Sequence, residues 1–143
     1  MKWHSAMNKK ITGTEFFEQI LAGQHDFHGS FLLKDFIASA NQLYAEVQAY
    51  LQKNAAVLKT NPIYIGDSVL LDVCLDGLML QYLEAENTHL TNVKFPSSNL
   101  NHSCFEYAAL RNVDFTGARY EGLKFNGAKL RKVKGLYTVF GEE

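Results

Sequence analysis

From about Ile63 to about Val133, hydrophobic residues recur every five positions along the chain. A period of five fits neither a helix, which repeats at about 3.6 residues, nor a plain strand, which repeats at about 2. It fits a short extended piece followed by a turn, in which a central residue and the residue two before it face inward together. We call the central residues anchors. They are Leu70, Leu75, Leu80, Ala85, Leu90, Phe95, Leu100, Phe105, Leu110, Phe115, Tyr120, Phe125 and Leu130.

The two positions after each anchor have the composition of a turn. Pro96 occupies the first of them, where its fixed φ is suitable and no ladder donor is lost. Glycine and asparagine are common at the second, where they supply the positive φ of a type II turn. These residues are Gly77, Asn87, Asn92, Asn112, Gly117, Gly122 and Gly127.

The anchors predict a four-sided coil of twenty residues. Two sides could not enclose an interior of Phe and Leu, so anchors twenty residues apart should stack in one wall. Within one wall, Leu83 and Ala85 should exchange large and small positions with Ser103 and Phe105, as a close-packed interior requires. The predicted stacks are Leu70, Leu90, Leu110 and Leu130; Phe95 and Phe115; Leu80, Leu100 and Tyr120; and Phe105 and Phe125.

This pattern resembles the pentapeptide-repeat family, whose consensus is Ala, then Asp or Asn, then a central Leu or Phe, then two variable residues. The clearest matches are the units at 113–117, 118–122 and 128–132, and a run of this length is a strong signal. The resemblance implies a right-handed quadrilateral β-helix, so the fold class is an all-β solenoid with N-terminal α-helical additions. The departures, which suggest a looser early coil, are Leu78, Leu83, Ala85 and Leu123.

The N-terminal segments are predicted to cover one end of the solenoid. Residues 1–11 lack an apolar core and are interpreted as a flexible tail. Residues 12–23 form a short capping helix, with Thr12 and Glu15 as a capping box and Gly23 at its end. The helix is too short to be stable alone and should pack on the first coil.

Residues 24–38 are predicted to form an incomplete first coil, because Phe27, Leu32 and Ile37 keep a step of five. Residues 39–60 are an inserted amphipathic helix that begins at a second capping box, Ser39 to Gln42. This helix is either a cap on the first coil or an element that binds a partner. The β-helix itself covers 61–135.

Residues 136–143 contain a short apolar run, which is interpreted as a cap over the last coil or as a dimer contact. A solenoid end must be covered, because its open strand edge would otherwise recruit further chains. A homodimer through the C-terminal end is therefore one expectation.

Composition indicates a single ordinary domain of 143 residues, 47% hydrophobic and 20% charged. The formal net charge of −1 argues against a general nucleic-acid binder. No apolar run reaches transmembrane length, so no membrane association is expected. Cys74 and Cys104 should point outward on opposite walls, too far apart for a disulfide. Reduced thiols fit a cytoplasmic location.

No catalytic constellation, cofactor motif or metal-ligand set is apparent, so an enzyme is not expected. The histidines are interpreted as solvated or locally hydrogen-bonded. Glycines lie at turn positions rather than in a phosphate-binding loop.

Charge is segregated along the predicted barrel. Residues 63–106 carry a net charge of about −5, and residues 107–134 carry about +5. Such a sign asymmetry favours steered association with a charged partner. The candidate partner-binding surface is Glu84, Glu86, Glu106, Arg111, Lys129, Arg131, Lys132 and Lys134.

The leading functional hypothesis is a non-enzymatic scaffold that binds another protein of unknown identity. The alternative comes from the resemblance: family members linked to quinolone resistance inhibit or protect a DNA topoisomerase, such as gyrase, by imitating duplex DNA. That mechanism needs a long acidic rod, whereas this barrel is short and its C-terminal half is basic. A bacterial effector acting on host proteins is a third hypothesis, for which the sequence carries no marker.

Overall fold

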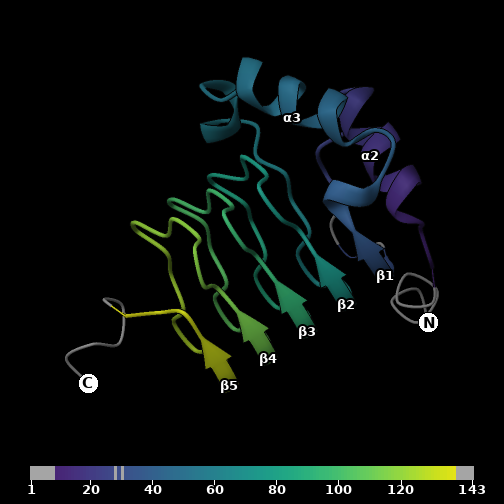
Figure 1. The fold of residues 1–143 in the computed structure, drawn as a ribbon. Helices are drawn as coiled ribbons and strands as arrows, with labels where there is room; N and C mark the ends of the chain where they lie inside the picture. The colour runs from purple at the N-terminus through teal and green to yellow at the C-terminus, as the bar shows by residue number, and fades with distance from the viewer. Residues whose placement is uncertain (1–8, 28, 30, 138–143) are drawn as a thin grey trace.

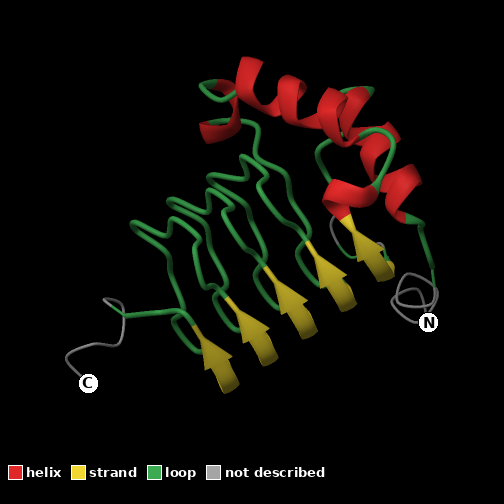
Figure 2. Cartoon of the chain, in the orientation of Figure 1, coloured by secondary structure: helices red, strands yellow, loops and turns green. Residues whose placement is uncertain are grey.

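The computed structural model describes residues 9–27, 29 and 31–137, and it shows a parallel β-solenoid (Figures 1 and 2). Five strands form one sheet in sequence order: β1 (Leu32–Ile37), β2 (Val69–Cys74), β3 (His89–Lys94), β4 (Ala109–Asp114) and β5 (Lys129–Lys134). The predicted all-β solenoid with N-terminal helices is confirmed.

The coil has four walls. Each strand bends at its fourth residue, which has a positive φ (Asp72 at 58°, for example), so one strand contributes to two walls. Parallel bridges build the other two walls, one through Met79, Asn99 and Arg119 and the other through Asp26, Tyr64, Glu84, Cys104 and Lys124. We call the outer surface of the first four residues of each strand the strand wall, and the last ladder the carboxylate wall.

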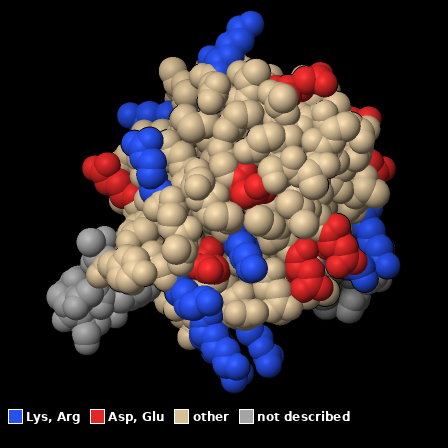
Figure 3. Space-filling model, viewed as in Figure 1, with Lys and Arg blue, Asp and Glu red and all other residues tan. Residues whose placement is uncertain are grey.

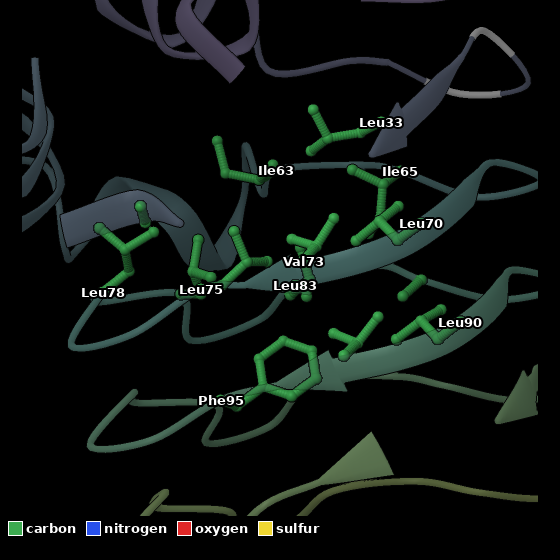
Figure 4. Close-up of a cluster of buried hydrophobic side chains, with 14 of the residues drawn as sticks. Leu33, Ile63, Ile65, Leu70, Val73, Leu75, Leu78, Leu83, Leu90 and Phe95 are labelled. Atoms are coloured by element: carbon green, nitrogen blue, oxygen red, sulfur yellow. The ribbon is translucent and has the colours of Figure 1, made fainter. Parts of the chain in front are cut away.

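The anchors stack as predicted. Leu70, Leu90, Leu110 and Leu130 share one ladder, which Leu33 extends into the first coil. The ring centroids of Phe95 and Phe115 lie 5.2 Å apart with an interplanar angle of 10°. Part of this interior, from Leu33 to Phe95, is shown in Figure 4.

Large and small residues exchange places where the sequence indicated. Leu83, Ala85, Ser103 and Phe105 are all buried. The Ser103 hydroxyl accepts a hydrogen bond from the Leu83 N–H at 3.1 Å, so the smaller residue also satisfies a buried backbone donor.

The predicted turn positions have left-handed backbone conformations. Gly77, Asn87 and Gly117 have φ values of 72°, 59° and 82°. The same conformation occurs at residues that bear large side chains, such as Tyr82 (65°) and Tyr107 (61°). The coil therefore imposes this conformation even where the residue type does not favour it.

The predicted register of the first coil is wrong after Phe27. Leu33, not Leu32, pairs with Leu70, and Ile37 is 56% exposed. Phe27 donates to the Tyr64 carbonyl and is buried. Leu33 lies six positions after Phe27, whereas Leu70 lies five positions after Ile65, so one additional residue shifts the inward face.

Helix α2 (Gly13–Leu21) covers the first coil. Thr12 caps it with the predicted capping box: the Thr12 hydroxyl accepts from the Glu15 N–H, and the Glu15 carboxylate accepts from the Thr12 N–H. Phe16 contacts Phe27 and Phe17 contacts Phe36, with centroid distances of 4.8 and 5.1 Å. These aromatic contacts hold the short helix in place.

Helix α3 (Tyr44–Lys53) is shorter than the helix predicted over 39–60 and is flanked by 3-10 turns at Ala38–Ala40 and Val57–Lys59. The predicted second capping box does not form. The Asn41 side chain instead accepts from the Leu43 N–H, and Leu43 at the N-cap makes no side-chain cap bond. The helices of the described residues are too short or too polar to span a bilayer.

Helix α3 takes the place of a missing coil above residues 76–79. The Gln48 amide donates to the Gly77 carbonyl and accepts from the Met79 N–H at 3.2 Å. The Tyr44 hydroxyl donates to the Asp76 carbonyl at 2.9 Å. One coil below, the counterparts of two of these groups pair with backbone: the Pro96 carbonyl accepts from the Gly77 N–H, and the Asn99 N–H donates to the Leu78 carbonyl. The helix is therefore a cap on the open edge of this coil.

Part of the predicted flexible tail is ordered. Lys10 forms a parallel bridge with Leu32, and Ile11 is buried and donates to the Leu32 carbonyl. At the other end Leu136 packs against the core, and the Tyr137 N–H donates to the Tyr120 hydroxyl. The remainder of the predicted C-terminal cap or dimer contact, including Val139 and Phe140, lies outside the described residues.

Ser68 and Ser98 both lie two residues before an anchor, but replacing each by alanine should change the stability in opposite directions. The Ser98 hydroxyl donates to the Leu75 carbonyl, whereas the buried Ser68 hydroxyl has no hydrogen-bond partner among the described residues. We expect Ser98→Ala to lower the free energy of unfolding by about 1 kcal/mol and Ser68→Ala to raise it by up to about 1 kcal/mol. Urea denaturation of both variants measures the difference. Equal losses would show that the Ser68 hydroxyl is satisfied.

Candidate functional site

The candidate partner-binding residues divide between adjacent walls rather than forming one surface. Arg111, Lys129, Arg131 and Lys132 lie on the strand wall and are exposed. Lys134 lies past the bend, next to Asp114. The three acids lie on the carboxylate wall or at its corner: Glu84, Glu86 and Glu106.

The carboxylate wall is hydrogen-bonded within itself. The Tyr64 hydroxyl donates to Glu86 Oε2 at 3.0 Å, and the Asn126 amide donates to Glu106 Oε2 at 2.9 Å. Burial, followed by the hydrogen bond to Glu86, raises the pKa of Tyr64 to about 12. Burial and the neighbouring Glu86 carboxylate raise the pKa of Glu84 above its ordinary value.

The raised pKa of Glu84 predicts that stability falls with rising pH. The stability that the protonated Glu84 carboxyl contributes is fully present below its ordinary pKa of 4.5. It is lost as the pH rises through the raised pKa of the folded state. We expect Glu84→Gln to raise the urea midpoint more at about pH 8 than at about pH 4. Glu121→Gln, at an exposed residue of another wall, is the control. A pH-independent effect of Glu84→Gln would contradict the assignment.

Cys104 is buried, although an outward-pointing side chain was expected to be exposed at this position. It lies between Glu84 and Lys124 in the ladder, and its Sγ lies within 4.8 Å of carboxylate oxygens of Glu84 and Glu86. Burial, together with the nearby carboxylates, raises the pKa of the Cys104 thiol. A protonated, covered thiol is a poor nucleophile.

We expect Cys74 to be modified faster than Cys104 by a thiol reagent under native conditions. Cys74 is partly exposed, although burial and Asp76 raise its pKa as well. Mass spectrometry of a labelling time course separates the two sites. Faster labelling of Cys104 than of Cys74 would contradict the burial of the Cys104 side chain.

Glu84, Glu86 and Cys104 are the one group of His, Cys, Asp and Glu side chains in the described ranges with donor atoms close enough to share a metal ion. Glu86 already accepts from Tyr64, and the raised thiol pKa disfavours the thiolate that a metal requires. The cluster is explained as a partly buried carboxylate pair. The twenty-residue spacing of Glu84 and Cys104 could have revealed their proximity.

Several lysine and arginine side chains lie on the strand wall at the β5 end of the solenoid. Arg111 and Arg131 are paired in register on β4 and β5, so their Cα atoms are about 4.8 Å apart, the usual strand spacing. A shallow depression of about 290 Å³ lies among His89, Thr91, Arg111, Lys129 and Arg131. Figure 3 shows lysine and arginine side chains projecting from this end of the molecule.

The strand wall is free of acids over its basic end. The outward residues of β3, β4 and β5 are His89, Thr91, Asn92, Ala109, Arg111, Asn112, Lys129, Arg131 and Lys132. Acids appear only nearer the other end, at Asp35 and Asp72. An amide chain, in which Asn112 donates to Asn92 and Asn92 to Asp72, runs along the corner.

One polar cluster was missed by the sequence analysis. His25 is buried; its Nδ1 lies 2.7 Å from the Asn61 carbonyl and its Nε2 lies 2.7 Å from the Tyr50 hydroxyl. It is therefore neither solvated nor locally bonded, as the histidines were expected to be. It joins α3 to the segment that enters β2, which is a structural role.

Solved structures of similar shape include repeat proteins. A trypsin-treated variant of QnrB1, a plasmid-mediated fluoroquinolone resistance protein, matches with a TM-score of 0.42 and 12% identity over 76% of this chain and 56% of its own. Rfr23, a pentapeptide-repeat protein from the cyanobacterium Cyanothece 51142, matches with a TM-score of 0.23 and 18% identity over 49% and 58%. The chain thus spans between half and two thirds of these proteins, and no residue role is transferred from them.

No curated protein matches the sequence significantly. Residues 84–117 match the family model described as pentapeptide repeats (8 copies). The matched segment lies in the middle of the four-sided coil, and the same five-residue register continues in the coils on both sides of it. Residues 84–117 therefore match pentapeptide repeats, and the coil that contains them keeps the five-residue register on both sides.

Proposed function

We propose that the chain is a non-enzymatic scaffold that binds another protein through the outer walls of its solenoid. The observation that carries this proposal is the acid-free cluster of cations on the strand wall. Arg111, Lys129, Arg131 and Lys132 are exposed, and no ion pair to a described residue neutralises them. Unpaired cations held on a rigid sheet favour fast, salt-sensitive association with an acidic surface.

The interior of the solenoid supports a binding role rather than a catalytic one. The anchors from Leu70 to Phe115 are buried side chains that fill the coil, so a ligand must bind outside. In the described part, the one group of side chains close enough to share a metal ion is the carboxylate pair with Cys104, whose thiol is covered and has a raised pKa. Two free cysteines suit the reducing cytoplasm, which is the compartment we propose.

The proposal is tested by affinity capture from a lysate of the source organism. Wild-type protein is compared with Arg111→Glu/Arg131→Glu and with a matched control, Lys53→Glu/Arg119→Glu, whose exposed cations lie on α3 and on another wall. We expect one partner to be retained by the wild type and the control, lost by the first variant, and weakened between roughly 50 and 200 mM salt. Absence of any partner that distinguishes these proteins would contradict the proposal.

The carboxylate wall favours a second candidate, an inhibitor or protector of gyrase that imitates DNA. Glu86 and Glu106 are one coil apart on that wall, as phosphate-like charges would be. A mimic would present acid along its whole length, which the cations at the β5 end do not. Reversing Lys129, Arg131, Lys132 and Lys134 should strengthen gyrase inhibition in a supercoiling assay if imitation of DNA is the function. Inhibition by the wild type at low micromolar concentration would promote this candidate.

A further inference from the structure

β5 is an edge of the parallel sheet. It pairs with β4 on one side, and within residues 9–137 no strand lies on its other side. The carbonyls of Phe31, Ser68, Thr88 and Ala108 each accept from the first N–H of the next strand. The Ala128 carbonyl is the next member of this series, and no described donor reaches it.

A second open group lies at the other end of β5. The N–H groups of Leu75, Phe95 and Phe115 each donate to the last residue of the next strand. The Gly135 N–H is next in this series, and it too has no backbone partner in the described part. The Ala128 carbonyl and the Gly135 N–H, one at each end of β5, therefore lack described partners. In the coils of β2, β3 and β4, the equivalent two groups bond to the next strand.

The inward side of β5 is apolar and incompletely covered. Leu130 and Val133 are half-buried, whereas Leu110 and Val113 directly above them are 1% and 0% exposed. A depression of about 360 Å³ lies among Leu130, Val133, Leu136 and Lys132. In the coils above, the next strand places a leucine and a valine over these positions.

The outward side of β5 is basic. Lys129, Arg131 and Lys132 are exposed, Arg111 lies beside Arg131, and no described acid pairs with them. A sixth strand in register would place its own outward residues about 4.8 Å from these cations. Carboxylates are the side chains that would neutralise them.

We propose that β5 accepts, as an added parallel strand, an extended segment of a partner protein in which acidic and apolar residues alternate. The register sets the pattern. Acids face Lys129, Arg131 and Lys134, and apolar residues cover Leu130 and Val133. A residue that tolerates positive φ, such as asparagine, lies opposite Lys132, whose φ is 55°. This inference rests on the proposed scaffold function and names its binding element and the chemistry of its partner.

A nucleic acid explains these observations less well. The basic cluster is a few side chains on one narrow wall of a protein with formal net charge −1, and nucleic-acid binding is driven mainly by many phosphate contacts. A nucleic acid also brings no peptide groups to pair with Ala128 and Gly135, and no apolar side chains to cover Leu130. An added peptide strand can use the basic side chains, the open backbone groups and the half-covered apolar side chains of β5 together.

The test uses the full chain and a fluorescent peptide, Glu-Leu-Asp-Asn-Val-Glu, measured by fluorescence anisotropy. The comparison peptides are a scramble, Leu-Glu-Glu-Val-Asp-Asn, and a basic version, Lys-Leu-Lys-Asn-Val-Lys; a short DNA duplex is tested in parallel. We expect the patterned peptide to bind and the other three probes to bind at least about tenfold more weakly, because each lacks either the pairing charges or the register. Equal binding of the scramble, or tighter binding of the duplex, would overturn the proposal.

Protein variants and hydrogen exchange locate the site. Lys129→Glu/Arg131→Glu should weaken the patterned peptide about tenfold or more, and the Lys53→Glu/Arg119→Glu control should not. The bound peptide should slow amide exchange in β5 and at Gly135. Slowed exchange confined to another wall would overturn the proposal.

Two further outcomes would also overturn it. One is a wild-type dimer, seen by light scattering, that buries β5 against a second copy. The other is peptide binding that appears only in a version ending at Tyr137, which would mean that the chain's own following segment covers β5. If the peptide does not bind but the wild type still captures a partner that Arg111→Glu/Arg131→Glu does not, strand addition is refuted and the scaffold function remains supported.

Discussion

Replacing Phe105 by alanine is expected to lower the free energy of unfolding by about 3–5 kcal/mol, as for other emptied aromatic sites in protein cores. The Phe105 side chain is fully buried. Its ring stacks on Phe125 at 5.8 Å and meets the edges of Phe95 and Phe115 at 6.0 and 5.9 Å. Ala85, the anchor of the same wall in the coil above, is too small to fill the cavity. Urea denaturation measures the loss.

Leu71→Ala is the matched control for this prediction. Leu71 lies on β2 next to the anchor Leu70 but faces outward and is only half-buried. We expect it to cost well under about 1 kcal/mol. If Leu71→Ala were the more destabilising of the two, the division into inward and outward positions would be wrong.

Replacing Gln48 by leucine should cost about 2 kcal/mol, because it leaves two partly buried backbone groups without partners. The Gln48 side chain pairs with the Gly77 carbonyl and with the Met79 N–H. The counterpart of the Met79 N–H one coil below, the Asn99 N–H, donates to the Leu78 carbonyl instead. Leucine keeps most of the side-chain volume and the helix propensity of α3. The loss therefore reports the hydrogen bonds rather than the packing.

Gln52→Leu on the same helix is the control, since Gln52 is exposed. We expect a change within about 0.5 kcal/mol. Amide exchange at Met79 should accelerate in the Gln48 variant and stay unchanged in the Gln52 variant. Equal stabilities of the two variants would show that water replaces the Gln48 amide without loss.

The repeat section was predictable because its tertiary contacts are themselves periodic. Each residue of the coil meets the residues twenty positions before and after it, as Leu70 meets Leu90, so the requirements of one coil are repeated in the next. The five-residue spacing therefore encodes both the walls and the inward face. Gly or Asn at the second turn position indicated the bends for the same reason.

The first coil and the helices were less predictable because their contacts are not repeated. One additional residue between Phe27 and Leu33 moves the inward face, and only pairing with β2 reveals it. The start of α3 at Tyr44 depends on Asn41 folding back onto Leu43. His25, bonded to Tyr50 and Asn61, has no sequence pattern that distinguishes it from an exposed histidine.

The candidate partner-binding surface was likewise predictable in part. From the sequence alone, the charges form an acidic half and a basic half along the axis, and that count is correct. Which wall each charge occupies follows from its position within the five-residue unit, and this separates Glu84 and Glu86 from Arg111 and Arg131. The burial of Cys104 and the raised pKa of Glu84 depend on the bulk and charge of neighbours one coil or two residues away.

The coil, its four walls and the residues that fill it follow from the sequence pattern alone, because a solenoid repeats one local rule. The elements at the two ends of the solenoid could be placed only from their three-dimensional contacts. At one end, α2 covers the first coil, and α3 supplies side-chain hydrogen bonds in place of a missing coil, as Gln48 does for Met79. At the other, β5 presents an edge with Leu130 and Val133 half-covered. An end breaks the repeat, so its contacts depend on the particular segments that reach it.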